Sequence, residues 1–297
     1  MNSIMKKKSI FSTKGQRADI GDITIYRILA NRYANKVGSF VFLDHVAPKI
    51  QARPNNSGTG AHPHRGIATL TYVIDGEVEH FDSLGNRQRV HSGGIQWMKA
   101  GNGIVHDESL SYDSNNDSKL IHGFQFWINL PSEIKAQKPE YLAIQANDVP
   151  VKELDGNGGL LKVIVGQYET LASKIPNYLT QFLYHVHLKP QKKLSLDFES
   201  NLEVAAFLPS QEVTINDTRF NAGEFVLFDK GNGSIELSNT LNEAVDILLF
   251  GGEEYTETIV AEGPFVMNTQ LGLAEAYKDY YAGNYGVISP PVNTNNK

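Results

Sequence analysis

The sequence predicts an all-β protein of two domains, with a short helix near the C-terminus. The chain has 297 residues, which suits two domains of about 100 to 150 residues each. Short segments rich in Val, Ile, Phe and Tyr are separated by turn signals such as Asp75-Gly76 and Asn157-Gly158-Gly159. A clear helical period is found only close to the C-terminus. Such a pattern favours β-sandwiches or barrels over βαβ units.

Composition excludes several classes of protein. A formal net charge of -6 argues against direct binding to nucleic acid, because phosphate binding needs a basic face. The chain has no cysteine, which excludes disulfides, thiolate zinc sites, iron–sulfur clusters and cysteine nucleophiles. The basic start of the chain lacks the apolar core of a signal peptide, and no run of residues is long enough to span a membrane. We therefore expect a cytoplasmic protein without a membrane partner.

The first half reads as a series of short strands that ends at a polar segment. Thr69, Thr71 and Val73 alternate with Leu70 and Tyr72, which is typical of a strand with two different faces. The polar segment 131–139 is predicted to be a linker. It divides the chain into an N-terminal metal-binding domain, residues 1–135, and a C-terminal domain, residues 136–297. The strands expected in the first half are 23–29, 39–46, 67–74, 77–82, 89–91, 95–98 and 120–130.

The second half repeats this rhythm and then changes period. The strands expected there are 160–165, 182–188, 204–208, 219–228 and 245–250. Leu271, Ala274, Lys278 and Tyr281 follow at helical steps. The helix should begin at Asn268 or Thr269 and end near Gly283. The tail 288–297 is expected to be frayed.

Four residues form a candidate set of metal ligands. His62 and His64 are two positions apart, and so are His106 and Glu108. On extended chain, both members of each pair point to the same face, so two facing strands would bring three imidazoles and one carboxylate onto one ion. Asp107 would point away. We expect ordinary roles for the remaining histidines, namely His45, His80, His91, His122, His185 and His187.

Several motifs resemble those of the pirin family in the cupin superfamily. They are His62-Pro63-His64-Arg65-Gly66, Gly76-Glu77-Val78-Glu79-His80, Asp82-Ser83-Leu84-Gly85-Asn86, Gln96-Trp97-Met98, Gly103-Ile104-Val105-His106 and Gly263-Pro264-Phe265-Val266-Met267-Asn268-Thr269. The resemblance implies a bicupin of two tandem β-sandwich barrels. It also implies a mononuclear non-heme iron, held in the first barrel by His62, His64, His106 and Glu108. The second cupin would carry no metal site.

The same resemblance implies two alternative functions. One is a quercetin 2,3-dioxygenase, an oxidoreductase that opens the central ring of flavonols with O2 and releases carbon monoxide. In that case Glu108 would be both a metal ligand and the catalytic base for the flavonol hydroxyl. The other is a metal-dependent protein-interaction partner that regulates transcription or a metabolic enzyme without physiological catalysis. Fe(II) is the ion expected, although nickel, manganese, cobalt, copper and zinc accept the same ligands.

Overall fold

Two β-barrels, each made of a seven-stranded and a four-stranded antiparallel sheet, form the protein. The structure is a computed structural model that describes residues 5–20, 23–55 and 58–288. The seven-stranded sheet of the first barrel runs, in spatial order, β12 (Glu140–Ile144), β9 (Ile95–Lys99), β6 (Ile67–Asp75), β11 (Leu120–Asn129), β4 (Phe40–Ile50), β3 (Ile23–Leu29) and β2 (Gln16–Ile20). Its four-stranded sheet runs β5 (His62–His64), β10 (Ile104–Ser111), β7 (Glu77–Asp82) and β8 (Arg87–His91).

The second barrel repeats this plan. Its seven-stranded sheet runs β1 (Ser9–Lys14), β22 (Glu224–Phe228), β19 (Leu202–Phe207), β24 (Val245–Glu253), β17 (Gln181–Leu188), β14 (Gly159–Val165) and β13 (Val151–Leu154). Its four-stranded sheet runs β18 (Lys193–Phe198), β23 (Gly233–Ser238), β20 (Val213–Ile215) and β21 (Thr218–Phe220). Outside the barrels are the hairpins β15 (Gln167–Tyr168) with β16 (Leu171–Ala172) and β25 (Val260–Glu262) with β26 (Phe265–Met267), the helices α1 (Ser132–Lys135) and α2 (Gln270–Tyr281), and the 3-10 turns η1 (Ala146–Asp148) and η2 (Asp155–Asn157). The predicted all-β bicupin with a C-terminal helix is confirmed.

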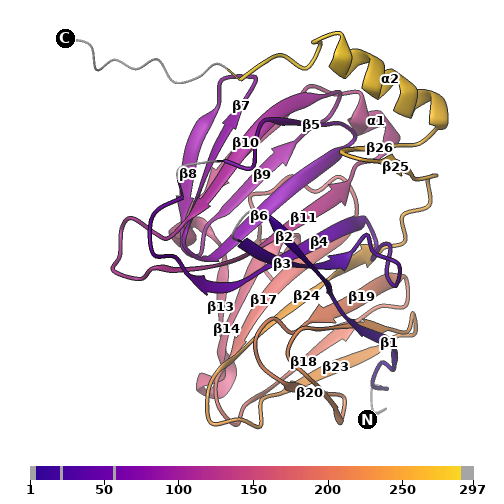
Figure 1. The fold of residues 1–297 in the computed structure, drawn as a ribbon. Helices are drawn as coiled ribbons and strands as arrows, with labels where there is room; N and C mark the ends of the chain where they lie inside the picture. Colours follow the sequence, from indigo (N-terminus) through magenta and orange to yellow (C-terminus); the bar gives the residue numbers. More distant parts are fainter. Residues whose placement is uncertain (1–4, 21–22, 56–57, 289–297) are drawn as a thin grey trace.

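The two ends of the chain cross over to the opposite barrels. Strand β1 pairs with β22, so the N-terminal strand completes the seven-stranded sheet of the second barrel. Helix α2 and the β25–β26 hairpin lie against the first barrel, at the top of Figure 1. An ion pair of 2.7 Å between Arg65 and Asp279 fastens α2 there. The C-terminal segment therefore becomes part of the surroundings of β5.

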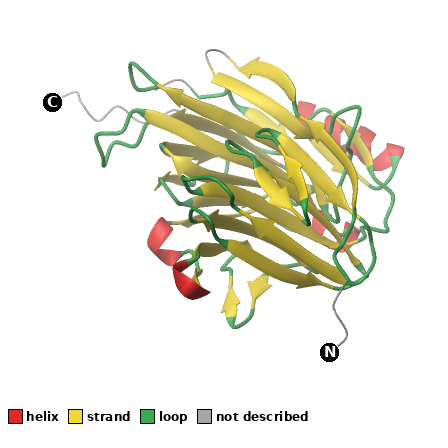
Figure 2. Cartoon of the chain, turned by 90° about the horizontal axis from the view of Figure 1, so that it is seen from below, coloured by secondary structure: helices red, strands yellow, loops and turns green. Residues whose placement is uncertain are grey.

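The interiors of the two barrels differ in polarity. A large apolar core lies between the barrels, where the seven-stranded sheets meet; Phe250 of β24 contacts Phe40 and Phe126, with ring centroids 5.4 and 5.6 Å apart. The second barrel is filled by a further apolar core that includes Leu161 and Val186. The first barrel instead has two small apolar groups and a set of buried histidines. Figure 2 shows the strands stacked as layers, with the helices at the edges.

Several sequence predictions can be checked in detail. Helix α2 begins after Thr269, whose hydroxyl accepts a hydrogen bond from the Gly272 N–H, so the predicted N-cap is confirmed. The predicted strand 219–228 was wrong as one element, because a turn with Gly223 at φ 78° separates β21 from β22. The frayed tail lies outside the described residues, apart from Ile288. In the described parts of the chain, neither helix has the length and apolar character needed to cross a bilayer.

The segment 131–139 differs from a solvated linker. It contains α1, in which Ile134 and Lys135 are buried. The Lys135 ammonium donates hydrogen bonds to Asn129 Oδ1 at 2.8 Å and to the Val266 carbonyl at 2.7 Å. Its burial lowers the pKa of Lys135 to about 8. The segment is thus packed against the C-terminal hairpin.

Candidate metal centre

Strand β10 places the candidate ligands on one interior face. It lies between β5 and β7, with His106 opposite His62 on one side and Asp82 on the other. Glu108, two residues further along β10, lies opposite His80 of β7. Because side chains alternate along a strand, His106 and Glu108 share a face with these partners. Asp107 points to the other face, as expected, and accepts a hydrogen bond from the Gly60 N–H.

Three of the four predicted ligands form a compact group of imidazoles. One nitrogen from each of His62, His64 and His106 lies within 4.8 Å of the other two. The ring centroids of His62 and His106 are 4.4 Å apart, and each of these rings is 5.0 Å from that of His64. His64 and His106 are buried, and His62 is half-buried at the rim. The β5–β10 pairing therefore brings the predicted pair of His62 and His64 together with His106.

Backbone carbonyls orient two of these rings. His62 Nδ1 donates to the Gly60 carbonyl at 2.7 Å, and His64 Nδ1 donates to the Pro264 carbonyl at 3.1 Å. With Nδ1 carrying the proton, the Nε2 lone pair of each ring is available to a metal. His106 is fully buried, and neither of its ring nitrogens has a hydrogen-bond partner in the described part of the chain. Such a buried and unsatisfied imidazole is costly unless a ligand binds it.

Burial keeps His64 and His106 neutral. It lowers the pKa of His64 to about 3, with His62 adding a smaller repulsion. Burial also lowers the pKa of His106 well below its ordinary value, and His64 adds to this effect. A neutral imidazole is the form that coordinates a metal. The protein therefore holds these lone pairs ready at neutral pH.

Glu108 stands beside His106 but apart from the group of three imidazoles. Its carboxylate accepts hydrogen bonds from Thr71 Oγ1 at 3.2 Å and from Gln125 Nε2 at 2.8 Å. A carboxylate oxygen of Glu108 lies within 4.8 Å of donor nitrogens of His106 and His80. Glu108 thus belongs to a second group of donors that shares His106 with the first.

An apolar cavity of about 100 Å³ adjoins Glu108 inside the first barrel. Thr71, Gln125 and Glu108 are among the polar residues that line it, and Val73, Val78 and Phe124 are among the apolar ones. The cavity is smaller than the 300 to 1,000 Å³ or so of sites that enclose a whole drug-sized ligand.

His80, for which an ordinary role was expected, is buried beside His106, with ring centroids 5.4 Å apart. Its Nε2 lies 3.1 Å from Asp82 Oδ2. Burial acts to raise the pKa of Asp82, but hydrogen bonds from His80 and Asn86 outweigh it and lower the pKa. His80 and Asp82 alternate along the chain, which indicates that both face the same side of a strand. Their place beside Glu108 could be recognised only from the pairing of β7 with β10.

The other histidines take part in different contacts. His185 and His187 both bind Asp246 Oδ1, at 2.9 and 2.8 Å. His45 and His122 bond to each other through Nε2 at 3.0 Å. These four residues belong to β4, β11 and β17.

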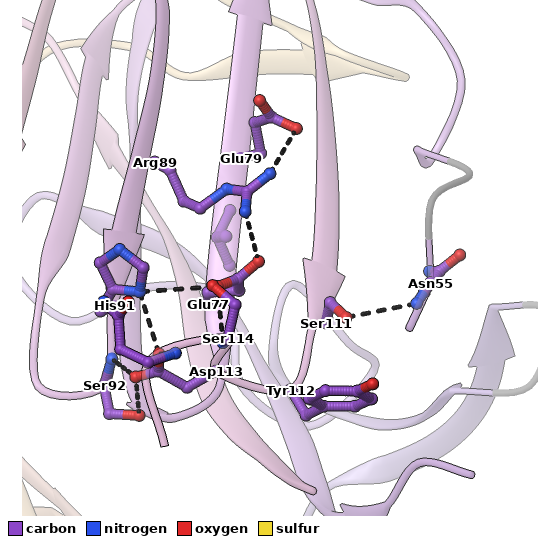
Figure 3. Close-up of polar contacts among 12 residues, drawn as sticks. Asn55, Glu77, Glu79, Arg89, His91, Ser92, Ser111, Tyr112, Asp113 and Ser114 are labelled. Carbon is purple, nitrogen blue, oxygen red and sulfur yellow. Dashed lines mark hydrogen bonds and ion pairs between the residues drawn. The ribbon is translucent and has the colours of Figure 1, made fainter. Parts of the chain in front are cut away.

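A third group of donors lies near the start of β7, in Glu77, His91 and Asp113. Figure 3 shows that these side chains are already bonded to protein groups. Glu77 binds Arg89 at 2.8 Å and Ser114 Oγ, and Asp113 binds His91 and Ser92. We regard this group as a hydrogen-bonded network at the edge of the sheet.

The donor chemistry of the centre suits a divalent transition metal. Neutral imidazoles with a nearby carboxylate fit iron, cobalt, nickel or zinc, and the unsatisfied nitrogens of His106 fit a missing ligand. Two tandem cupin barrels with such a centre in the first define a bicupin. Models of the pirin domain and of the pirin C-terminal cupin domain match residues 23–128 and 183–286. The chain belongs to the pirin family.

Similar proteins support this assignment. A pirin-like protein from Caulobacter vibrioides is 32% identical over 92% of this chain and 96% of its own length. A relative from Pseudomonas aeruginosa, whose name proposes a quercetin 2,3-dioxygenase, is 31% identical over 86% of this chain and 89% of its own.

Solved structures share the fold. The crystal structure of quercetin 2,3-dioxygenase from Acinetobacter baumannii is 29% identical and superposes with a TM-score of 0.85, covering 96% of this chain and 100% of that one. A nickel(II) complex of a bacterial pirin from Escherichia coli, at 21% identity and a TM-score of 0.63, covers 82% of this chain and 99% of that one; this likeness supports the fold alone.

Proposed function

We propose that this pirin is a metal-dependent dioxygenase that opens the ring of flavonols such as quercetin with O2. A mononuclear iron would be held by His62, His64, His106 and Glu108. The observation that carries the proposal is the buried His106, whose nitrogens have no partner among the described residues. It lies between two oriented imidazoles and a carboxylate at a cavity wall. The names of the relatives and the structural neighbour supply the substrate class.

Each part of the site has a task in this proposal. The apolar walls of the cavity exclude water and bind the edge of the flavonol that bears its hydroxyl. Glu108 accepts the proton of that hydroxyl, while Gln125 and Thr71 hold its carboxylate in place. When bound, the metal supplies a Lewis acid that favours the flavonol anion and the redox chemistry that O2 requires. Overall, one flavonol and one O2 give a ring-opened ester and one carbon monoxide.

Iron loading followed by a flavonol assay tests the proposal. Metal-free protein is loaded with Fe(II), its metal content is measured, and quercetin and O2 are added. We expect loss of the flavonol absorbance, with one O2 consumed and one carbon monoxide released for each quercetin. His106→Ala, which removes the central imidazole, serves as the metal-free control. A flat trace from fully iron-loaded wild-type protein would reject the enzyme in favour of the protein-interaction alternative.

A further inference from the structure

His80 is a buried histidine in the first barrel that the proposed iron ligands leave unused. Its strand, β7, pairs with β10 so that His80 lies directly opposite Glu108. Both side chains point into the barrel, and donor atoms of His80, His106 and Glu108 lie within 4.8 Å of one another. The ring of His80 stacks on Tyr141, with centroids 4.1 Å apart and an interplanar angle of 14°. Its position is therefore fixed.

Asp82 determines which nitrogen of His80 carries the proton. The backbone N–H groups of Leu84 and Asn86 donate to Asp82 Oδ1, each at 3.0 Å, and the Asn86 amide donates to Oδ2 at 2.8 Å. A carboxylate that receives three such bonds is an acceptor, so His80 Nε2 donates to it across 3.1 Å. The Nδ1 atom of His80 then carries the lone pair.

This lone pair has no partner among the residues that the structure describes. His80 is only 1% exposed, and its Nδ1 accepts no hydrogen bond. A buried acceptor left unsatisfied costs roughly 1 to 3 kcal/mol. A histidine held from behind by a carboxylate, with its other nitrogen free, has the arrangement of a metal ligand. The missing partner of Nδ1 is therefore explained if a cation binds there.

We propose that His80, His106 and Glu108 form a second donor set for the divalent metal, beside the set of His62, His64 and His106. The inference rests on the metal centre of the proposed function. Because both sets use His106, they are alternative positions for one ion. In the first position Glu108 is the fourth ligand of the proposed function, and it can leave the ion to accept a proton while Thr71 and Gln125 hold its carboxylate. In the second position Glu108 is one of only three ligands and stays on the ion, so the place of the ion decides whether Glu108 can act as a base.

Cobalt binding to single and double variants tests the second set without any turnover. His62→Ala removes only the first set, and His80→Phe removes only the second while keeping an aromatic ring on Tyr141. Co²⁺ affinity and the visible spectrum are measured on the full-length metal-free protein. We expect His62→Ala to bind one Co²⁺ per chain with an altered spectrum. Adding His80→Phe should weaken that binding at least about tenfold.

Two controls make the result specific. His62→Ala/His91→Ala removes a partly exposed histidine outside the centre and should bind Co²⁺ like His62→Ala. Thermal unfolding confirms that each variant folds, and His80→Gln replaces His80→Phe if that variant does not.

Equal Co²⁺ affinity in His62→Ala and His62→Ala/His80→Phe would overturn the second set and leave the first intact. An equal loss in the His91→Ala control would also overturn it. A wild-type protein that binds no Co²⁺ would reject both the second set and the metal centre of the proposed function.

Discussion

Gln125 Nε2 donates a hydrogen bond of 2.8 Å to Glu108 Oε2, across the wall of the cavity in the first barrel. The bond ties the carboxylate of β10 to the neighbouring seven-stranded sheet. Thr71 adds a longer bond of 3.2 Å to the other carboxylate oxygen. Glu108 is thus held from two sides in the position where the proposed base must act.

Gln125→Leu should lower turnover of the iron-loaded enzyme by a factor of about 10 to 100, because the carboxylate loses its better-placed donor. Iron content should stay near that of the wild type, since three imidazoles remain. Thr71→Val, which removes the longer bond at almost constant volume, should have a smaller effect. Measurement of kcat and KM on metal-quantified samples checks this order. Equal kcat in wild type and Gln125→Leu would show that Gln125 does not position the base.

Glu108→Gln tests the proton acceptor itself. The amide is close in shape to the carboxylate, but it cannot accept a proton at neutral pH. We expect a loss in kcat of about 10² to 10⁴, the usual contribution of a general base, while the imidazoles still bind metal. Metal analysis and flavonol turnover on the same sample provide the measurement. Unchanged turnover in a metal-loaded variant would eliminate the base role.

Gly66 joins β5 to β6 at the point where the C-terminal hairpin touches the first barrel. Its φ is 82°, and an added Cβ would lie 1.9 Å from the carbonyl oxygen of Val266. Gly66→Ala should therefore lower the free energy of unfolding by more than about 3 kcal/mol, through strain and a backbone clash. The shift of β26 should also move the Pro264 carbonyl away from His64 and weaken Co²⁺ binding.

Gly60 is the matched control for this variant. Its φ is 89°, but an added Cβ would meet nothing within 4 Å. Gly60→Ala should cost only about 1 to 2 kcal/mol, the strain of a left-handed backbone. Denaturant unfolding of both variants gives the comparison. Similar losses of unfolding free energy in Gly66→Ala and Gly60→Ala would mean that the clash with Val266 does not destabilise the Gly66 variant.

The sequence was most informative where local pattern and motif agreed. His62, His64 and His106 follow from alternation along β5 and β10, and Thr269 follows from the capping preference at the start of α2. The placement of each chain end on the opposite barrel could not be predicted. The pairing of Ser12 with Val226, for example, is encoded in no local sequence pattern. His80 was missed for the same reason, since its importance comes from the strand opposite.

Lys135 shows that the polar composition of a segment does not predict the burial of each of its residues. A lysine in a polar segment is usually exposed, but this one is buried by the C-terminal hairpin, which follows more than 100 residues later. Burial of this kind depends on tertiary packing.

The buried pair of His45 and His122 should make stability depend on pH. Burial lowers the pKa of His45 to about 3 and that of His122 to about 4, so both are neutral in the folded protein at pH 7. The unfolded chain binds protons near the ordinary pKa of about 6.5. The contribution of this pair to the free energy of unfolding is therefore fully present above about pH 6.5. It is lost as the pH falls toward the pKa of His122, about 4, and then that of His45, about 3.

Each histidine contributes a slope of at most about 1.4 kcal/mol per pH unit in that window. His45→Phe/His122→Phe keeps both rings but removes both titrating groups, so its free energy of unfolding should fall less steeply between pH 6.5 and 4. His45→Phe alone should give an intermediate slope. Urea unfolding of metal-free protein across this range gives the slopes, because His64 and His106 contribute equally to all three proteins. Parallel plots of unfolding free energy against pH for wild type and the double variant would mean that His45 and His122 take up no protons on unfolding. That result would contradict their lowered pKa values.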